Sequence, residues 1–156
     1  MTTGKLELEQ SGIAKPCSML DDGIQPTTGS ASLVYTGKEI KPVSAAFLAE
    51  GEDYEIAYYD NIDVGTARYA MTGKGNYVGT RTGSFAIVPG DLSSFDVEVD
   101  DAIADGSKLR PAVTVTAPDG ETILEKDKDY TVSYTSNIDP GTGFAWITGI
   151  GNYTGS

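Results

Sequence analysis

Few side chains in this sequence are suited to catalysis. None of the 156 residues is histidine, which excludes Ser-His-Asp and Cys-His nucleophiles and any histidine-ligated metal. Cys17 is the only cysteine, so the chain forms neither an internal disulfide nor a thiolate zinc cluster. Carboxylates remain as candidates, either as a pair for glycoside hydrolysis or as ligands of calcium.

Two acidic segments are the candidates for calcium. Asp60-Asn61-Ile62-Asp63 and Asn137-Ile138-Asp139 bring carboxylate and amide oxygens together, yet each supplies only two or three ligands. Asn and Asp also shape turns by hydrogen bonding to their own backbone. We therefore predict that both segments are turns, and that the chain takes no metal and no cofactor.

The other acidic residues do not indicate a catalytic pair. Glu55, Asp96 and Glu98 alternate with apolar neighbours, which is typical of the solvated face of a strand. Because no pocket signature accompanies them, we expect that the chain is not an enzyme.

The charge balance excludes several partners. Lys plus Arg is 11 and Asp plus Glu is 23, a formal charge of −12 that repels nucleic acids and anionic membrane surfaces. No run of 18 apolar residues is present, so we expect no membrane insertion. The first residues lack the pattern of a signal peptide, so if the natural protein is exported, this sequence is a piece of it.

An internal repeat organises the elements that position these residues. Residues 53–79 and 129–155, at an offset of 76, share 14 identities in 27 positions. Upstream, Thr36–Pro42 matches Asp105–Pro111 at an offset of 69, and Asp21-Asp22 matches Asp100-Asp101 at an offset of 79. The changes in offset fall in turn-type sequence, where extra residues cost little stability.

Each copy of the repeat has the two-residue period of strands. Tyr54, Ile56 and Tyr58 alternate with other neighbours along the chain. The same alternation is present at the counterparts in the second copy and at the start of that copy: Tyr130, Val132 and Tyr134, and Phe95, Val97 and Val99. Turn residues such as Pro118-Asp119-Gly120 separate the segments. Only residues 44–52 could form a helical turn.

This pattern predicts an all-β fold of two tandem β-sandwich modules. We place a closing-strand segment of a preceding repeat at residues 1–12, the first repeat at 13–89, and the second repeat, without its last strand, at 90–156. The junction is expected near Pro89-Gly90-Asp91. Cys17 aligns with Asp96 in an expected strand at 13–20, where a lone cysteine is typically a partly buried packing residue.

The repeat resembles a known family. Tyr35–Pro42, Asp53-Tyr54, Asn61 to Ala67 and Thr72-Gly73-Lys74-Gly75-Asn76-Tyr77 are similar to the immunoglobulin-like tandem repeat of large surface proteins of Gram-positive bacteria. The second copy departs early, with Ala104-Asp105-Gly106 in place of Tyr-Thr-Gly. The resemblance implies immunoglobulin-like modules and an extracellular location at the cell surface or cell wall.

The function that we expect is that of a non-catalytic spacer or stalk segment of a bacterial cell-surface or secreted protein. Its partners are then the neighbouring repeats of the same polypeptide, and its negative charge keeps neighbouring arrays apart. Two alternatives remain open: an adhesin module that binds a glycan or a host protein, and an accessory domain of a secreted enzyme.

Phe144 and Trp146 are the candidate ligand-binding residues. If Ala145 and Ile147 face the core, the two aromatic side chains face outward, at positions that hold Arg68 and Ala70 in the first copy. Neighbouring exposed aromatic rings can stack on a sugar or cover a contact between domains. In the opposite register Trp146 would fill the core.

Leu6 and Leu8 are the candidates for strand exchange. Thr3–Leu8 matches Thr82–Ile87, within the expected closing strand of the first copy, and no residues equivalent to that strand follow the second copy in the sequence. An unpaired edge beside an unfilled groove is a template for strand addition.

We therefore predict strand-exchanged self-association, with Leu6 and Leu8 inserted into the second module of a neighbouring molecule. Their own second module would lie too far away for a short linker to reach. The alternative is that both leucines pack onto the first copy beside Ile13.

Overall fold

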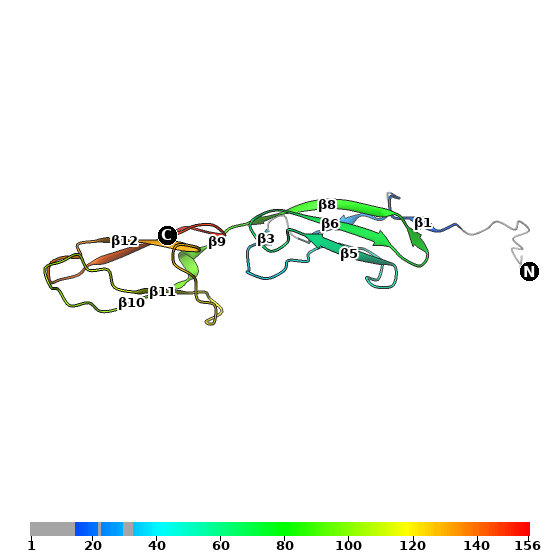
Figure 1. Ribbon diagram of the computed structural model, residues 1–156. Helices are drawn as coiled ribbons and strands as arrows, with labels where there is room; N and C mark the ends of the chain where they lie inside the picture. Colours follow the sequence, from blue (N-terminus) through cyan, green and yellow to red (C-terminus); the bar gives the residue numbers. More distant parts are fainter. Residues whose placement is uncertain (1–14, 22, 30–32) are drawn as a thin grey trace, which may run out of the picture.

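The computed structural model describes residues 15–21, 23–29 and 33–156, and these residues are all-β (Figure 1). They contain no α-helix, only the short 3₁₀ turn η1 (Leu92–Ser94). The predicted all-β class is confirmed. The described residues also contain no helix that is long and apolar enough to cross a membrane.

The strands are short, with the exception of two. Their bounds are β1 (Cys17–Ser18), β2 (Pro26–Thr27), β3 (Leu33–Val34), β4 (Ser44–Ala45), β5 (Tyr54–Tyr59), β6 (Gly65–Gly73), β7 (Tyr77–Val78), β8 (Thr80–Val88), β9 (Gly90–Asp91), β10 (Asp96–Val99), β11 (Val113–Thr116), β12 (Tyr130–Thr135), β13 (Phe144–Gly149) and β14 (Tyr153–Thr154).

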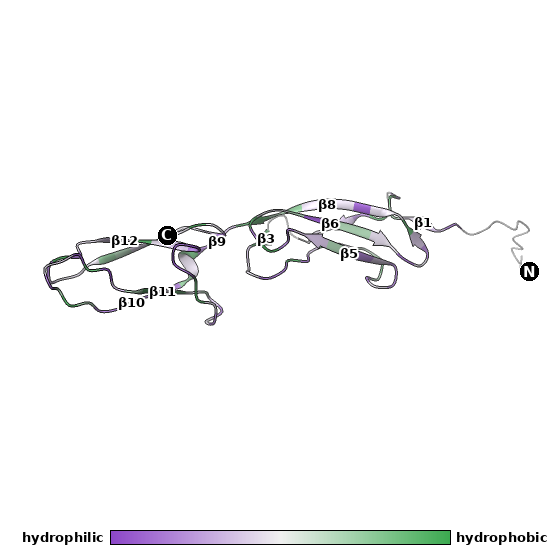
Figure 2. Cartoon of the chain, viewed as in Figure 1, coloured by the Kyte–Doolittle hydropathy of each residue, from purple (hydrophilic) through white to green (hydrophobic). Residues whose placement is uncertain are grey.

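The first repeat is built around one four-stranded sheet with the order β3-β8-β6-β5. β6 pairs antiparallel with β5 on one edge and with β8 on the other, and β3 runs parallel to the end of β8. β8 changes from hydrophilic near its start to hydrophobic at its end (Figure 2), because Phe85 and Ile87 enter the core there. The short pairs β1–β7 and β2–β4 complete this part of the chain.

The second repeat repeats this plan with fewer paired strands. β12 pairs antiparallel with β13, β10 with β11, and β14 runs parallel to β9. β12–β13 corresponds to β5–β6 of the first repeat, because the two pairs contain the matching sequence segments. Among the described residues, no strand takes the place of β8 beside β13.

Each repeat has its own hydrophobic core, and the first is the larger. The first core contains Met19, Ile24, Val43, Ala45, Tyr54, Ala67, Met71, Phe85 and Ile87. The second contains Leu92, Val115, Leu124 and Tyr130, with Phe95, Val113, Val132, Ile147 and Tyr153 packed against it. The second core is smaller because, among the described residues, the second repeat has no counterparts of Phe85 and Ile87, which β8 places in the first core.

The predicted alternation along the central strands is confirmed. β5 and β12 have the same burial sequence, in which the first, third and fifth side chains face the core and the others are exposed. Phe95 also faces the core, but Val97 and Val99 of β10 remain 46% and 43% exposed. All four residues of β10 are exposed, so the alternation predicted for residues 95–99 is not seen in that strand.

Two details of the expected strands were wrong. The segment at 44–52 forms no helical turn; it begins with β4 and continues into a turn. Within the described part of 13–20, strand structure is limited to Cys17–Ser18, and Cys17 pairs with Tyr77 as Gly90 pairs with Tyr153. The structural counterpart of Cys17 is therefore Gly90, at an offset of 73, and not Asp96.

The predicted turn at residues 118–121 is held by the Asp119 side chain. Its carboxylate accepts hydrogen bonds from the backbone N–H groups of Thr122 (2.9 Å) and Glu121 (3.0 Å) and from the Thr122 hydroxyl (2.7 Å). These donors favour the charged form and lower the pKa of Asp119 to about 2.

Candidate functional site

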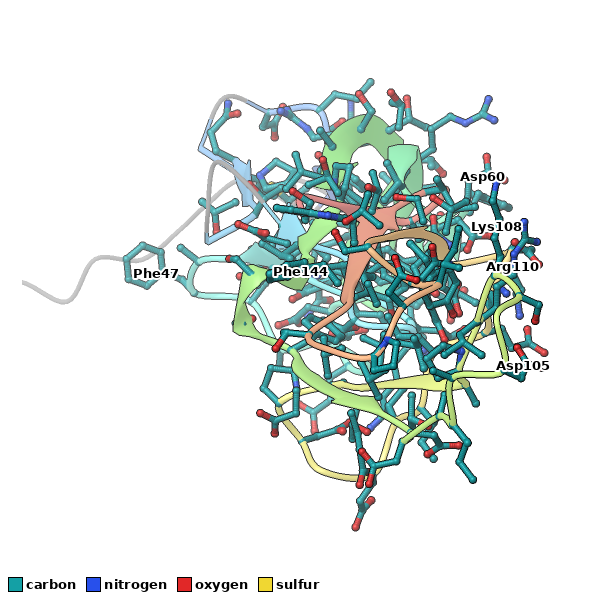
Figure 3. All side chains as sticks on the ribbon, turned by 90° about the vertical axis from the view of Figure 1, so that its left-hand side faces the viewer. Phe47, Asp60, Asp105, Lys108, Arg110 and Phe144 are labelled. Carbon is teal, nitrogen blue, oxygen red and sulfur yellow. The ribbon has the colours of Figure 1, made fainter. Side chains whose placement is uncertain are left out.

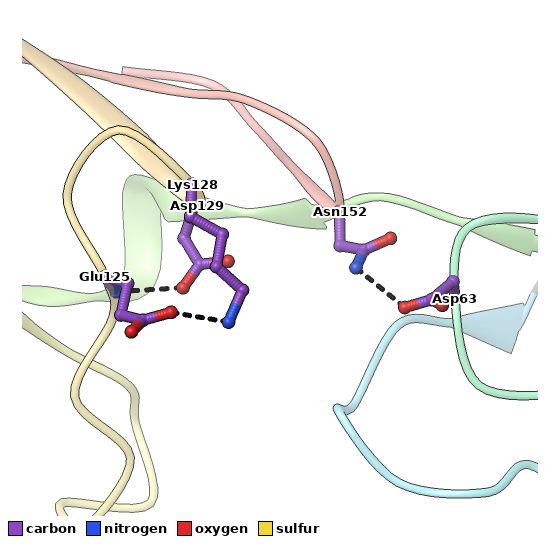
Figure 4. A network of polar contacts seen from close by, with 5 residues as sticks. All are labelled: Asp63, Glu125, Lys128, Asp129 and Asn152. Carbon is purple, nitrogen blue, oxygen red and sulfur yellow. Dashed lines mark hydrogen bonds and ion pairs between the residues drawn. The ribbon is translucent and has the colours of Figure 1, made fainter.

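The two repeats meet at a joint formed by Tyr35, Asp63, Val64, Gly90, Asn152 and Tyr153. Asn152 is the polar centre of this joint: its Oδ1 accepts a hydrogen bond from the Val64 N–H (3.0 Å), and its Nδ2 donates to Asp63 Oδ1 (3.0 Å). Figure 4 shows the Asn152–Asp63 contact between the two repeats. Both groups of one amide side chain are thus used to hold the preceding repeat.

Tyr153 is the apolar centre of the joint. Its ring meets Tyr35 of the first repeat edge-on, with centroids 5.3 Å apart, and Phe95 of the second repeat at 5.6 Å. Edge-to-face pairs of this kind are favourable beyond the area that they bury. Burial raises the pKa of the Tyr153 hydroxyl.

Local backbone geometry explains why Asn152 and Tyr153 reach the joint. Gly151 has φ +65°, a left-handed angle that turns the chain back after β13. The Gly90 N–H then donates to the Asn152 carbonyl (3.0 Å), which fixes the linker against the turn. A Cβ on Gly90 would lie 3.2 Å from the Tyr153 ring, so glycine allows this close approach.

The same turn is present at the other end of the first repeat. There the Cys17 N–H donates to the Asn76 carbonyl (2.9 Å), as the Gly90 N–H does to Asn152. Asn76 and Tyr77 therefore occupy the positions of Asn152 and Tyr153, at the end of the first repeat that lies away from the joint (Figure 1).

Cys17 itself is exposed, and its expected role as a partly buried packing residue was wrong. The register difference explains the error, because Cys17 takes the position of a linker glycine instead of a strand interior. Its thiol donates to Asp21 Oδ2 at 3.2 Å, and this contact with a carboxylate is the main cause of its raised pKa.

The two acidic segments form bends between strands, but their asparagine side chains bond to distant carbonyl groups and not, as the turn prediction implied, to their own backbone. Asn61 is buried and its Nδ2 donates to the Ile40 carbonyl (3.1 Å), while Asn137 Nδ2 donates to the Leu109 carbonyl (2.6 Å). Asp60 forms an ion pair with Arg68 at 2.7 Å. No group of three potential metal ligands occurs within the described residues.

Phe144 and Trp146 lie on the outer face of the β12–β13 sheet, 55% and 59% exposed. The register that directs them outward is the predicted one, since Ala145 and Ile147 are partly buried. Their cross-strand neighbours are Thr135 and Ser133, both exposed. In the end-on view of Figure 3, Phe144 lies on the opposite side from Lys108 and Arg110.

Replacing both aromatic residues, as Phe144→Ser and Trp146→Ser, is expected to change the free energy of unfolding by less than about 1 kcal/mol. Exposed side chains of this kind contribute little to packing, and substitutions away from the core are usually small in effect. Urea unfolding followed by circular dichroism measures the change. A loss of 3 kcal/mol or more would place Trp146 in the core instead.

Leu6 and Leu8 lie outside the described residues.

The joint was not found by sequence reasoning, although the two copies carry a signal for it: Tyr35 and Val64 in the first become Ala104 and Pro140 in the second. Those two differences remove an aromatic partner and a backbone N–H from the equivalent end of the second repeat.

No protein-family model, no curated protein and no solved structure matches this chain.

Proposed function

We propose that the chain is a structural spacer or stalk segment of a bacterial cell-surface or secreted protein, built from two tandem immunoglobulin-like β-sandwich modules. The observation that carries this proposal is the joint, in which residues almost 90 positions apart hold the repeats end to end. A spacer needs length and resistance to bending, and the joint provides a direct means of limiting bending.

The arrangement of the repeats supports this role. Each repeat has its own core, and the two lie in line with β8 leading into the linker (Figure 1). The nine residues of β8 alone extend over about 30 Å, at about 3.3 Å per residue. A formal charge of −12 would keep parallel stalks apart at moderate ionic strength.

The experiment that tests the spacer role is removal of the polar contacts of the joint by Asn152→Ala, which leaves the Tyr35–Tyr153 contact in place. Loss of both side-chain hydrogen bonds is expected to let the repeats reorient, at a stability cost of about 1–2 kcal/mol. Small-angle scattering should show a broader distribution of maximum dimension, and NMR relaxation should show different tumbling times for the two repeats.

Asn76→Ala is the matched control, because Asn76 is the equivalent residue at the end of the first repeat away from the joint. It should leave both the scattering profile and the tumbling times unchanged. If the two repeats of the unmodified chain already tumble independently, the joint does not stiffen the molecule and the spacer role is refuted.

The second candidate function is an adhesin module, for which the observation is the exposed pair Phe144 and Trp146 beside the hydroxyls of Ser133 and Thr135. Aromatic rings flanked by hydroxyl groups are suited to stacking on a sugar and hydrogen bonding to it. A glycan-array screen separates the two functions: a hit that is lost in the Phe144→Ser and Trp146→Ser variant favours the adhesin.

A further inference from the structure

The outer edge of β13 has no paired strand among the described residues. In the first repeat the equivalent strand, β6, pairs with β8 over eight positions, from Gly65 to Thr72. β13 pairs with β12 on its other side and, among the described residues, with no second strand. At this edge the Gly149 N–H donates to the Gly155 carbonyl (3.0 Å). Because peptide groups alternate along a strand, those of Ala145 and Ile147 point to the same edge.

Two hollows lie along the same edge. One, of about 280 Å³, has Val99, Leu109 and Tyr134 in its apolar lining, Gly141 and Gly143 just ahead of β13, and Asp100, Asp101 and Asp139 in its polar lining. The other, of about 150 Å³, is lined by residues that include Leu92, Val97, Val115, Trp146 and Ile147. Ala145 borders both hollows, and each is lined by residues of β10 and of β13.

The register of the first repeat identifies which side chains would fill the larger hollow. There Ile87 lies opposite Gly65 and Phe85 opposite Ala67, and both are buried, at 2% and 8% exposure. The counterparts of Gly65 and Ala67 are Gly141 and Gly143, which line the hollow. A strand with two apolar side chains spaced two residues apart would therefore place them in the larger hollow, beside Val99, Leu109 and Tyr134.

We propose that residues Thr3–Leu8 of a second copy of this chain add to the edge of β13 as an antiparallel strand. This segment, Thr-Gly-Lys-Leu-Glu-Leu, has the pattern of Thr82–Ile87, Thr-Gly-Ser-Phe-Ala-Ile. In the β6–β8 register Leu6 lies opposite Gly143 and Leu8 opposite Gly141. Lys5 and Glu7 then face outward, Lys5 beside Phe144.

The occupant comes from another copy because the chain's own segment cannot reach. Cys17 is bonded to Asn76, at the end of the first repeat away from the joint. Seven residues from Lys15 back to Leu8 span at most about 25 Å, which is less than the length of β8 alone. The two hollows lie beyond β8 and the joint.

The resulting contact is heterologous, because the donor and acceptor surfaces differ, and each chain offers one of each. Such contacts extend into open chains unless a rotation closes them into a ring. This association is separate from the spacer role, which concerns the joint within one chain.

The first test is sedimentation equilibrium of three chains over a range of concentration. The unmodified chain should show a mass that rises above 16.4 kDa with concentration. Leu6→Asp with Leu8→Asp should weaken the association at least about 100-fold, since two buried leucines are lost. Lys5→Gln with Glu7→Gln, which keeps net charge and both leucines, should associate like the unmodified chain.

The second test traps the register covalently. In a Cys17→Ser background, Lys5→Cys on one chain and Phe144→Cys on another would lie at directly opposite, non-hydrogen-bonded positions, where Cα atoms are about 4.5 Å apart. Mixing them in a glutathione redox buffer should give a disulfide-linked heterodimer. Thr148→Cys, four residues along β13, should give none.

A monomer at all concentrations for the unmodified chain would overturn the proposal. So would unchanged association after the Leu6 and Leu8 substitutions, because the donor would then be another segment, such as a second β13 edge. Equal crosslinking of Lys5→Cys to residues 144 and 148 would exclude the register. In each case the scattering profile of the Asn152→Ala variant still tests the spacer role by itself.

Discussion

Replacing Gly149 by alanine is expected to destabilise the second repeat by about 3 kcal/mol or more. An added Cβ would lie 2.7 Å from the Thr154 nitrogen and 2.9 Å from the Tyr153 carbonyl carbon. These are backbone atoms of the turn, so no side chain can rotate away, and overpacking of this kind costs 1–3 kcal/mol or more. The displaced turn carries Asn152, so the joint should be lost as well.

Trp146 fluorescence measures this effect selectively, because it is the only tryptophan and lies in the second repeat. For a unit of this size, each kcal/mol of lost stability lowers the midpoint of thermal unfolding by about 4–8 °C. The midpoint followed by Trp146 fluorescence should therefore fall by about 12 °C or more. Gly23→Ala is the control: nothing lies within 4 Å of its Cβ, and its φ is not left-handed. An unchanged Trp146 midpoint in Gly149→Ala would contradict the packing described for this turn.

Met71→Ala is expected to cost about 2–5 kcal/mol in the first repeat. The Met71 side chain has 0% exposure and is one of the largest fully buried side chains of the larger core. Truncating it removes apolar contacts and leaves a cavity that the surrounding strands fill only in part. Urea unfolding followed by far-UV circular dichroism should show the loss in the first repeat.

The same experiment tests whether the repeats are separate folding units. Because the two cores share no residue, the Trp146 transition should shift by less than about 0.5 kcal/mol in Met71→Ala. Ile147→Ala, at the counterpart position in the partly buried face of β13, should move the Trp146 transition instead. Equal shifts of both transitions in Met71→Ala would show that the repeats unfold as one unit.

The sequence by itself determined the class of fold and the faces of the central strands. Tyr54, Ile56 and Tyr58 face the core, and Phe144 and Trp146 face outward, because alternation along a strand depends only on the local geometry of successive residues. The repeat added the correspondence of β5–β6 with β12–β13, since those segments match at one constant offset. Turn chemistry at Asp119 was readable for the same local reason, whereas the contact of Asn61 with Ile40 joins residues far apart in the sequence.

Only the tertiary structure decided the equivalence of Cys17 with Gly90 and the contacts of Asn152. Both depend on which backbone groups meet across the chain, and insertions in a turn change the sequence offset without changing that pairing. The same is true of Tyr35 and Tyr153, whose rings touch only because the linker places the repeats end to end. Local alternation fixes the face of a side chain, whereas contacts between residues 88 positions apart depend on the relative position of the two repeats.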